Sequence, residues 1–182
     1  MDIEGFRIVA LAAPGSVEAG FGKLQAEIFS RYGLASAQAM PPMIPVAFLP
    51  AEASTRGLLE SLNESVRAPW SIRTTECEWA EDYLYVGIVS GGAWAALRAR
   101  TLQECGAGAK QLFPIREGFF MGCGEATPAQ RDTIRPAVPP VAFSSSDLVL
   151  VSIESALGRG AWWRELYWET IEQRPLRGRR EK

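Results

Sequence analysis

The sequence contains no histidine, which removes the side chain that most often transfers protons or binds transition metals near neutral pH. Cysteine is also scarce: Cys77, Cys105 and Cys123 form no Cys-x-x-Cys motif. A zinc site would have to be assembled from scattered thiols and carboxylates, so we expect no metal and no other cofactor. The odd, sparse cysteine count favours a cytoplasmic location over a disulfide framework.

Long apolar runs and a strong excess of one charge are also absent. No apolar segment is long enough to cross a bilayer, and the acidic first residues lack the basic region of a signal peptide, so we expect no membrane association. The formal net charge of −2 argues against a broad basic surface for nucleic acids. With 47% hydrophobic and 22% charged residues the composition is that of a globular protein, and we expect a single domain over residues 1–172.

Basic residues are concentrated at the end of the sequence. Residues 173–182 hold Arg174, Arg177, Arg179, Arg180 and Lys182 against one acid, Glu181. Such a segment can contact phosphates in a salt-dependent way, but we favour the simpler interpretation of a solvated terminus. We therefore treat residues 173–182 as a basic C-terminal tail.

The first part of the sequence predicts alternating strands and helices. Residues 6–13 predict a buried strand that Pro14 ends. Ser16 is a candidate N-cap and Gly33 a candidate C-cap for the helix that follows. The proline-flanked stretch 43–49 predicts a second buried strand. Further helices are expected over 54–67 and 93–104, and further strands over 72–77 and 83–90.

The remainder repeats the order strand, helix, strand. Residues 113–122 predict a strand, and Thr127-Pro128 is a typical start for a short helix. Residues 147–154 (DLVLVSIE) predict another buried strand. The aromatic segment 161–170 fits a strand or a helix by periodicity, and we assign a strand because β-forming residues dominate it.

This order of elements resembles the 2H phosphoesterase superfamily, in particular its 2'-5' RNA ligase (LigT-like) and cyclic phosphodiesterase members. MIPVAFL at 43–49 is similar to the family's first His-x-Thr/Ser strand, and FPIREGFF at 113–120 is similar to the second. Residues 143–153 resemble a late family segment, a polar turn before Glu-Leu-Val-Leu. The resemblance implies an α+β fold in which two pseudo-symmetric lobes of antiparallel strands surround a central cleft, with helices outside.

In the family each lobe brings one histidine and one hydroxyl to the cleft, and the resemblance implies a metal-free reaction in which one imidazole takes a proton while the other gives one. This sequence departs from that pattern in the first motif strand. Met43 takes the histidine position and Pro45 the hydroxyl position, and strand alternation adds Ala47 to the cleft side. A thioether, a pyrrolidine ring and a methyl group neither transfer protons nor bind phosphate.

The second motif strand has two registers. In one, Ile115 replaces the histidine and Glu117 the hydroxyl residue; in the other, Arg116 and Gly118 take these positions. A shift of one residue exchanges the faces of a strand completely. We favour Arg116 and Gly118 because a guanidinium can bind a phosphate through two parallel hydrogen bonds.

The leading hypothesis is a catalytically degenerate protein that binds a nucleotide, a cyclic phosphate or an RNA end in the cleft without turnover. A positioned general acid or base contributes roughly 10²–10⁴-fold each, and arginine cannot supply this contribution because it stays protonated. Tyr85, Trp79 and Trp94 are candidates for stacking on a base; core packing is the simpler account of each.

Two other functions fit the sequence. An enzyme with rewired chemistry would use Glu117, Glu125 or Cys123 as base or nucleophile, with a nearby arginine to activate the thiol. A non-catalytic partner-binding or oligomerising domain would instead use an apolar cleft around Met43.

Overall fold

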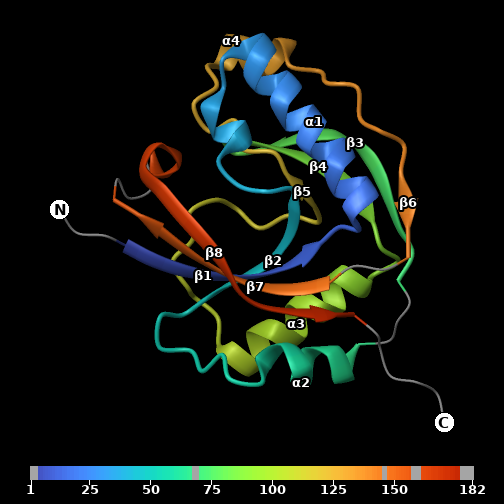
Figure 1. Cartoon of the computed structure of the whole chain (residues 1–182), viewed down its shortest axis with the longest axis vertical. Coiled ribbons are helices and arrows are strands. Elements are labelled where there is room, and N and C mark those ends of the chain that lie inside the picture. Colours follow the sequence, from blue (N-terminus) through green and yellow to red (C-terminus); the bar gives the residue numbers. More distant parts are fainter. Residues whose placement is uncertain (1–3, 67–69, 145–146, 157–160, 177–182) are drawn as a thin grey trace.

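The computed structural model describes residues 4–66, 70–144, 147–156 and 161–176, which form two antiparallel sheets with helices on their outer sides (Figure 1). The elements in chain order are β1 (Glu4–Ala12), α1 (Gly15–Tyr32), the 3-10 turn η1 (Ala35–Gln38), β2 (Met43–Leu49), α2 (Leu58–Ser65), β3 (Ile72–Ala80), β4 (Tyr83–Val89), α3 (Ala93–Cys105), β5 (Gly118–Phe120), α4 (Pro128–Thr133), β6 (Ala142–Phe143), β7 (Asp147–Ser155), the 3-10 turn η2 (Trp162–Glu165) and β8 (Leu166–Pro175).

Each sheet has four strands. Sheet A has the order β2-β1-β7-β8 and is built from the two ends of the chain, whereas sheet B has the order β5-β4-β3-β6 and is built from its middle. Neighbouring strands pair antiparallel throughout both sheets. The predicted α+β class, with two related sheets and helices outside, is confirmed.

The local signals in the sequence account for most element ends. Gly33 ends α1 in the left-handed conformation at a φ of 71°, which only glycine adopts without strain. Thr127 begins α4 with a capping box shared with Gln130. The prediction for Ser16 was wrong: α1 begins two residues earlier than predicted, with Pro14 as the N-cap residue and Ser16 exposed in the first turn.

The two long helices each cover the sheet to which their flanking strands do not belong. Helix α1 leaves β1 of sheet A and lies over sheet B, where Phe21 stacks on Phe119 with ring centroids 4.0 Å apart (Figure 1). Helix α3 leaves β4 of sheet B and lies against β2 of sheet A. Helix α2 packs beside α3 and against β7 and β8.

Several predicted bounds needed correction. Only Gly118–Phe120 of the segment 113–122 pairs as a strand, in part because Pro114 has no N–H to donate. The segment 161–170 begins as a 3-10 turn because Trp162 is drawn into the core, with its carbonyl accepting from Ser155 Oγ. Helix α2 is shorter than predicted; residue 67 lies outside the described residues. Strand β8 continues to Pro175, so the tail predicted from residue 173 begins inside a strand; residues 177–182 lie outside the described part.

Candidate functional site

Strand β2 contains the residues that resemble the family's first motif strand. A β-bulge in β2 determines which of its side chains lie on which face of sheet A. Ala10 pairs with Pro45 and Val9 with Ala47, so Val46 is an extra residue without a partner on β1. Beyond the bulge the alternation reverses. Met43 and Pro45 therefore share the inner face of sheet A with Phe48, and the prediction that Ala47 lies on that side was wrong.

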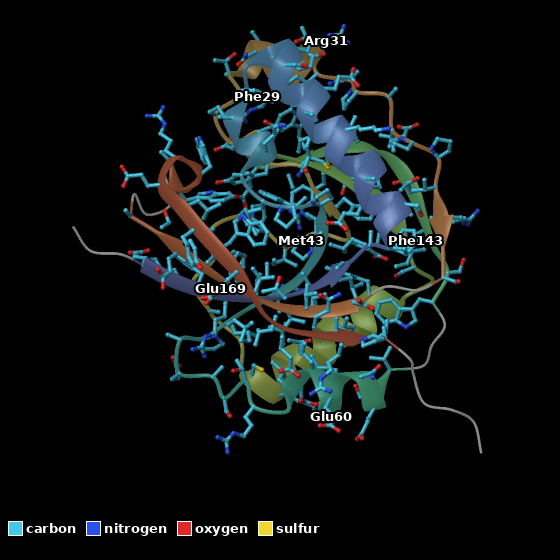
Figure 2. The ribbon with its side chains drawn as sticks, viewed as in Figure 1. Phe29, Arg31, Met43, Glu60, Phe143 and Glu169 are labelled. Carbon is cyan, nitrogen blue, oxygen red and sulfur yellow. The ribbon has the colours of Figure 1, made fainter. Side chains whose placement is uncertain are left out.

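Met43 and Pro45 are both buried in the fold. All seven residues of β2 are buried, and Met43 is 3% exposed. Figure 2 places Met43 in the middle of the molecule, between the two sheets. Three surface cavities of about 230, 460 and 420 Å³ lie elsewhere, and none of the three is lined by Met43, Pro45 or Arg116. The thioether therefore serves as a core side chain.

Aromatic rings fill the space between the inner faces of the two sheets. Phe113 contacts rings from both sheets. Its ring centroid lies 3.9 Å from that of Phe120, in a stacked arrangement, and 5.1 Å from that of Phe48. Trp162, which is fully buried, donates from Nε1 to Tyr83 Oη at 3.0 Å, and Tyr83 donates to the carbonyl of Leu112. This packing joins the two sheets in one continuous core.

The outer edge of β2 is closed by side chains from α3. Trp94 donates from Nε1 to the carbonyl of Pro45 at 3.1 Å, and Arg98 donates from Nη1 to the carbonyl of Val46 at 2.5 Å. Arg98 was not identified from the sequence. Its signal is weak, because an arginine on a helix looks like any surface charge until the fold brings it to a strand 52 residues away.

The second motif segment places its candidates in three environments. Ile115 is buried, Arg116 is exposed and Glu117 is half-buried. Gly118 pairs with Gly87, and Tyr85 with Phe120, so Gly118 shares the inner face of sheet B with these aromatic residues. A side chain at Gly118 would collide with the carbonyl of Val86, 2.6 Å from the added carbon, so only glycine fits there.

Glu117 has a structural partner. Its carboxylate accepts from Ser90 Oγ at 2.5 Å, and the same hydroxyl accepts from the backbone N–H of Trp94 at 3.0 Å, in the first turn of α3. This chain of hydrogen bonds fixes the start of α3 against β5. The carboxylate is therefore engaged rather than directed at a ligand.

Arg98 and Arg116 bring two positive charges together. Burial, and then the charge of Arg116, lower the pKa of Arg98, whose guanidinium also lies 5.8 Å from the Trp94 ring. Within the described ranges neither guanidinium forms a salt bridge with a carboxylate. Two positive charges that act on each other without an acidic partner favour an anion.

Of the three predicted stacking residues, Tyr85 and Trp94 are buried and Trp79 is half-buried. Tyr85 is fully buried, its hydroxyl donates to the carbonyl of Pro114, and burial raises its pKa far above the usual range. Trp94 is 9% exposed and is held by Pro45. Trp79 is half-buried on β3, with the Arg131 guanidinium 5.6 Å from its ring. Each of the three packs in the fold.

The glycine-rich segment around Cys123 is structural. Cys123 is fully buried at a φ of 69°, and burial, followed by the charge of Glu125, raises its pKa to about 12. Such a thiol stays protonated at neutral pH and is a poor nucleophile. Glu125 accepts from both the backbone N–H and the hydroxyl of Ser36, which joins this segment to η1.

Within the described ranges no group of three or more histidine, cysteine or carboxylate residues could hold a metal ion. The helices of this same part of the chain also lack the length and apolarity needed to cross a bilayer.

No protein-family model and no curated protein matches the sequence. Solved structures do match. E. coli LigT complexed with 3'-AMP aligns over 94% of this chain and 97% of LigT, with a TM-score of 0.64 and 15% sequence identity. The chain has the LigT fold. A phosphoesterase (TM-score 0.59, 14% identity, 94% of this chain and 98% of that one) and a protein from Thermus thermophilus (TM-score 0.55, 18% identity, 96% and 100%) are similar as well.

The LigT fold is therefore present over nearly the whole chain, as the resemblance in the sequence implied. At identities of 14–18% the likeness establishes the fold, and any activity has to be argued from the residues of this chain.

Proposed function

We propose that this protein binds a phosphate-bearing ligand, such as a nucleotide, a cyclic phosphate or an RNA end, without turning it over. The observation that carries the proposal is that the charge of Arg116 acts on Arg98, while neither arginine forms a salt bridge among the described residues. Arg98 lies beside the strand that holds Met43 and Pro45, where it donates to the carbonyl of Val46. We place this binding in the cytoplasm, since the three cysteines are free thiols.

The two ladders support Arg116 as the counterpart of Met43. In sheet A, Met43 pairs with the last residue of β1 and Pro45 with the residue two before it. In sheet B, Gly118 pairs with Gly87, two before the last residue of β4. The equivalent of Pro45 is then Gly118, and the equivalent of Met43, two residues earlier, is Arg116.

The residues at these positions argue against catalysis. Met43, Pro45 and Gly118 carry no group that transfers protons, and arginine remains protonated at neutral pH. The nearby phenol and thiol, Tyr85 and Cys123, both have raised pKa values because they are buried. Of the residues that the rewired-enzyme hypothesis named, Cys123 is a protonated thiol, and the carboxylates of Glu117 and Glu125 accept hydrogen bonds from Ser90 and Ser36.

The solved relatives suggest which ligands to try. E. coli LigT has been crystallised with 3'-AMP, with NADP+ and with phosphate. We extend to this chain only the class that the three share, a phosphate group on a small molecule or alone.

Isothermal titration with 3'-AMP at low salt tests the proposal. We expect binding that weakens about 10-fold or more in Arg116→Gln and in Arg98→Gln, because each loses a charge-assisted hydrogen bond. Arg56→Gln, an exposed arginine on the loop before α2, is the matched control and should bind like the parent. Absence of heat from folded parent protein with 3'-AMP, NADP+ and phosphate would refute ligand binding.

Turnover is measured separately, by phosphorus NMR of a 2',3'-cyclic nucleotide incubated with the protein. We expect the cyclic phosphate to persist at the rate of the buffer control. Hydrolysis that Arg116→Gln abolishes would overturn the non-catalytic part of the proposal while leaving the site in place.

A further inference from the structure

Strand β8 is the edge strand of sheet A, unpaired on its outer side within the described residues, and is unusually exposed. Eight of its ten residues are exposed, and the strand carries three of the five large apolar side chains that the described surface exposes. These are Tyr167, Trp168 and Ile171, with exposed fractions of 60%, 37% and 48%. A long edge strand with apolar residues is a template for pairing with another strand.

A β-bulge divides β8 into two arms. Val151 pairs with Thr170 and Leu150 with Glu172, so Ile171 is an extra residue. Because the alternation reverses there, residues on opposite sides of the bulge share a face when their numbers differ in parity. One face carries Trp168, Thr170, Gln173 and Pro175, and the other carries Tyr167, Glu169, Glu172 and Arg174.

We propose that β8 pairs antiparallel with β8 of a second copy of this chain, in the register that places Glu169 opposite Arg174 in both directions. In an antiparallel pair, two residues that lie opposite each other have their side chains on the same face of the sheet. This holds because, along a strand, the face of the side chain alternates together with the direction of the backbone hydrogen bonds. The bulge lets Glu169 and Arg174 meet this condition although they lie five residues apart. The pairing would join the two A sheets into one continuous sheet.

The same register is complementary on both faces of β8. On one face, Glu169 and Arg174 form two symmetry-related pairs of opposite charge. On the other face it opposes Trp168 to Pro175 and Thr170 to Gln173, which are an apolar pair and a hydrogen-bonding pair. At the two-fold axis, Ile171 of each copy lies opposite Glu172 of the other copy. Figure 2 labels Glu169 beside β8.

Arg174 can serve both its own chain and the second copy. Its Nε donates to Glu172 of the same chain at 2.9 Å, and its side chain is 53% exposed. Among the described residues, the two terminal nitrogens of this guanidinium have no carboxylate partner, so they can donate to a second carboxylate. The intrachain contact holds Arg174 in place for this role.

A second copy fits this edge better than an unrelated peptide. The complementarity lies entirely within β8, with the acid in one arm and the base in the other, so an antiparallel copy satisfies both arms at once. One strand pair buries less than a standard interface, so we expect a weak, concentration-dependent dimer.

Sedimentation velocity of the full chain, from about 5 to about 500 μM, tests the proposal over the range expected for a small interface. We expect the weight-average mass to rise towards that of a dimer. Glu169→Arg and Arg174→Glu should each weaken the dimer about tenfold or more, because each creates two pairs of like charge. The double variant E169R/R174E should regain the affinity of the parent.

Glu52→Arg, an exposed charge reversal on the loop after β2, is the matched control and should dimerise like the parent. Circular dichroism verifies that each variant is folded. A parent that stays monomeric, a series of oligomers beyond the dimer, or a double variant as weak as the single ones would overturn the proposal. None of these outcomes depends on ligand binding by Arg98 and Arg116.

Discussion

The two edges of sheet A are opposite in character. Strand β2 is buried along its whole length, and side chains from α3 bind the carbonyls of Pro45 and Val46 at its edge. Strand β8, three strands away, exposes eight of its ten residues. One edge is closed by tertiary packing and the other is left open to solvent.

The difference in exposure between the two edges indicates which parts of sheet A a ligand or partner can reach. In the resembled family the edge corresponding to β2 carries a catalytic histidine, whereas here the same strand is part of a packed core around Met43 and Phe48. A buried apolar strand gains stability from packing and gives up access to substrate. Interaction surfaces are then expected at the exposed Arg116 and at β8, the opposite edge of sheet A.

Among the substitutions that test the closed edge, Trp94→Ala is expected to have the largest effect on stability. We expect a loss of about 3–5 kcal/mol in the free energy of unfolding, because a buried aromatic side chain and the donor to Pro45 are both removed. Trp94→Phe is the control for the donor alone and should cost about 1–3 kcal/mol. Urea unfolding gives both values, and a loss below about 1 kcal/mol for the alanine variant would show that β2 is not sealed by α3.

Met43→His tests whether this fold tolerates the histidine that the resembled family has at this position. A polar ring at this buried site should cost about 1–3 kcal/mol at pH 8. Burial lowers the pKa of an imidazole below that of the unfolded chain, so the variant should lose further stability as the pH falls below about 6.5. Urea unfolding at pH 8 and pH 5, with Met43→Leu as the volume-matched control, measures the difference. Equal stability at both pH values would mean that the position is accessible to water.

Ser90→Ala breaks the hydrogen-bond chain that ties the start of α3 to Glu117. The change leaves the Trp94 N–H and the Glu117 carboxylate without their partner, and we expect a loss of about 1–2 kcal/mol. Thermal unfolding compares this variant with Ser71→Ala, an exposed serine that should change stability by less than about 0.5 kcal/mol. Equal unfolding temperatures for the two variants would mean that Ser90 has no structural role.

The smallest effect on stability is expected at the open edge. Ile171→Thr removes an exposed side chain from β8 and should change the free energy of unfolding by less than about 0.5 kcal/mol. A loss above about 1 kcal/mol in urea unfolding would mean that β8 packs more tightly than its exposure indicates. The comparison between the two edges is sharpest if Trp94→Ala and Ile171→Thr differ by several kcal/mol.

The alternation of strands and helices could be predicted because its signals are local. Gly33 ends a helix and Thr127 begins one through backbone conformation and capping, which depend on a few neighbouring residues. The order of these elements was enough to predict the fold class. The uniformly apolar run 43–49, in contrast, gives no information on which face each residue occupies, so the bulge at Val46 and the exchange of Ala47 for Phe48 could not be foreseen.

The candidate site was harder to predict because its features come from contacts between distant segments. Arg98 meets β2 across 52 residues, and no periodicity records that contact. Cys123 stood out because glycines flank it, yet those glycines serve packing: a side chain at Gly122 would collide with the carbonyl of Ser36. The burial that makes Cys123 unreactive is a property of the assembled core.

The exchange of helices between the sheets makes the molecule a single cooperative unit. Helix α1 belongs by sequence to sheet A but completes the core of sheet B, and α3 does the reverse. A fragment that contained one sheet with its own helix would expose the surface meant for the other helix. Unfolding should therefore proceed in one transition, and two fragments of the chain should regain structure only when they are mixed.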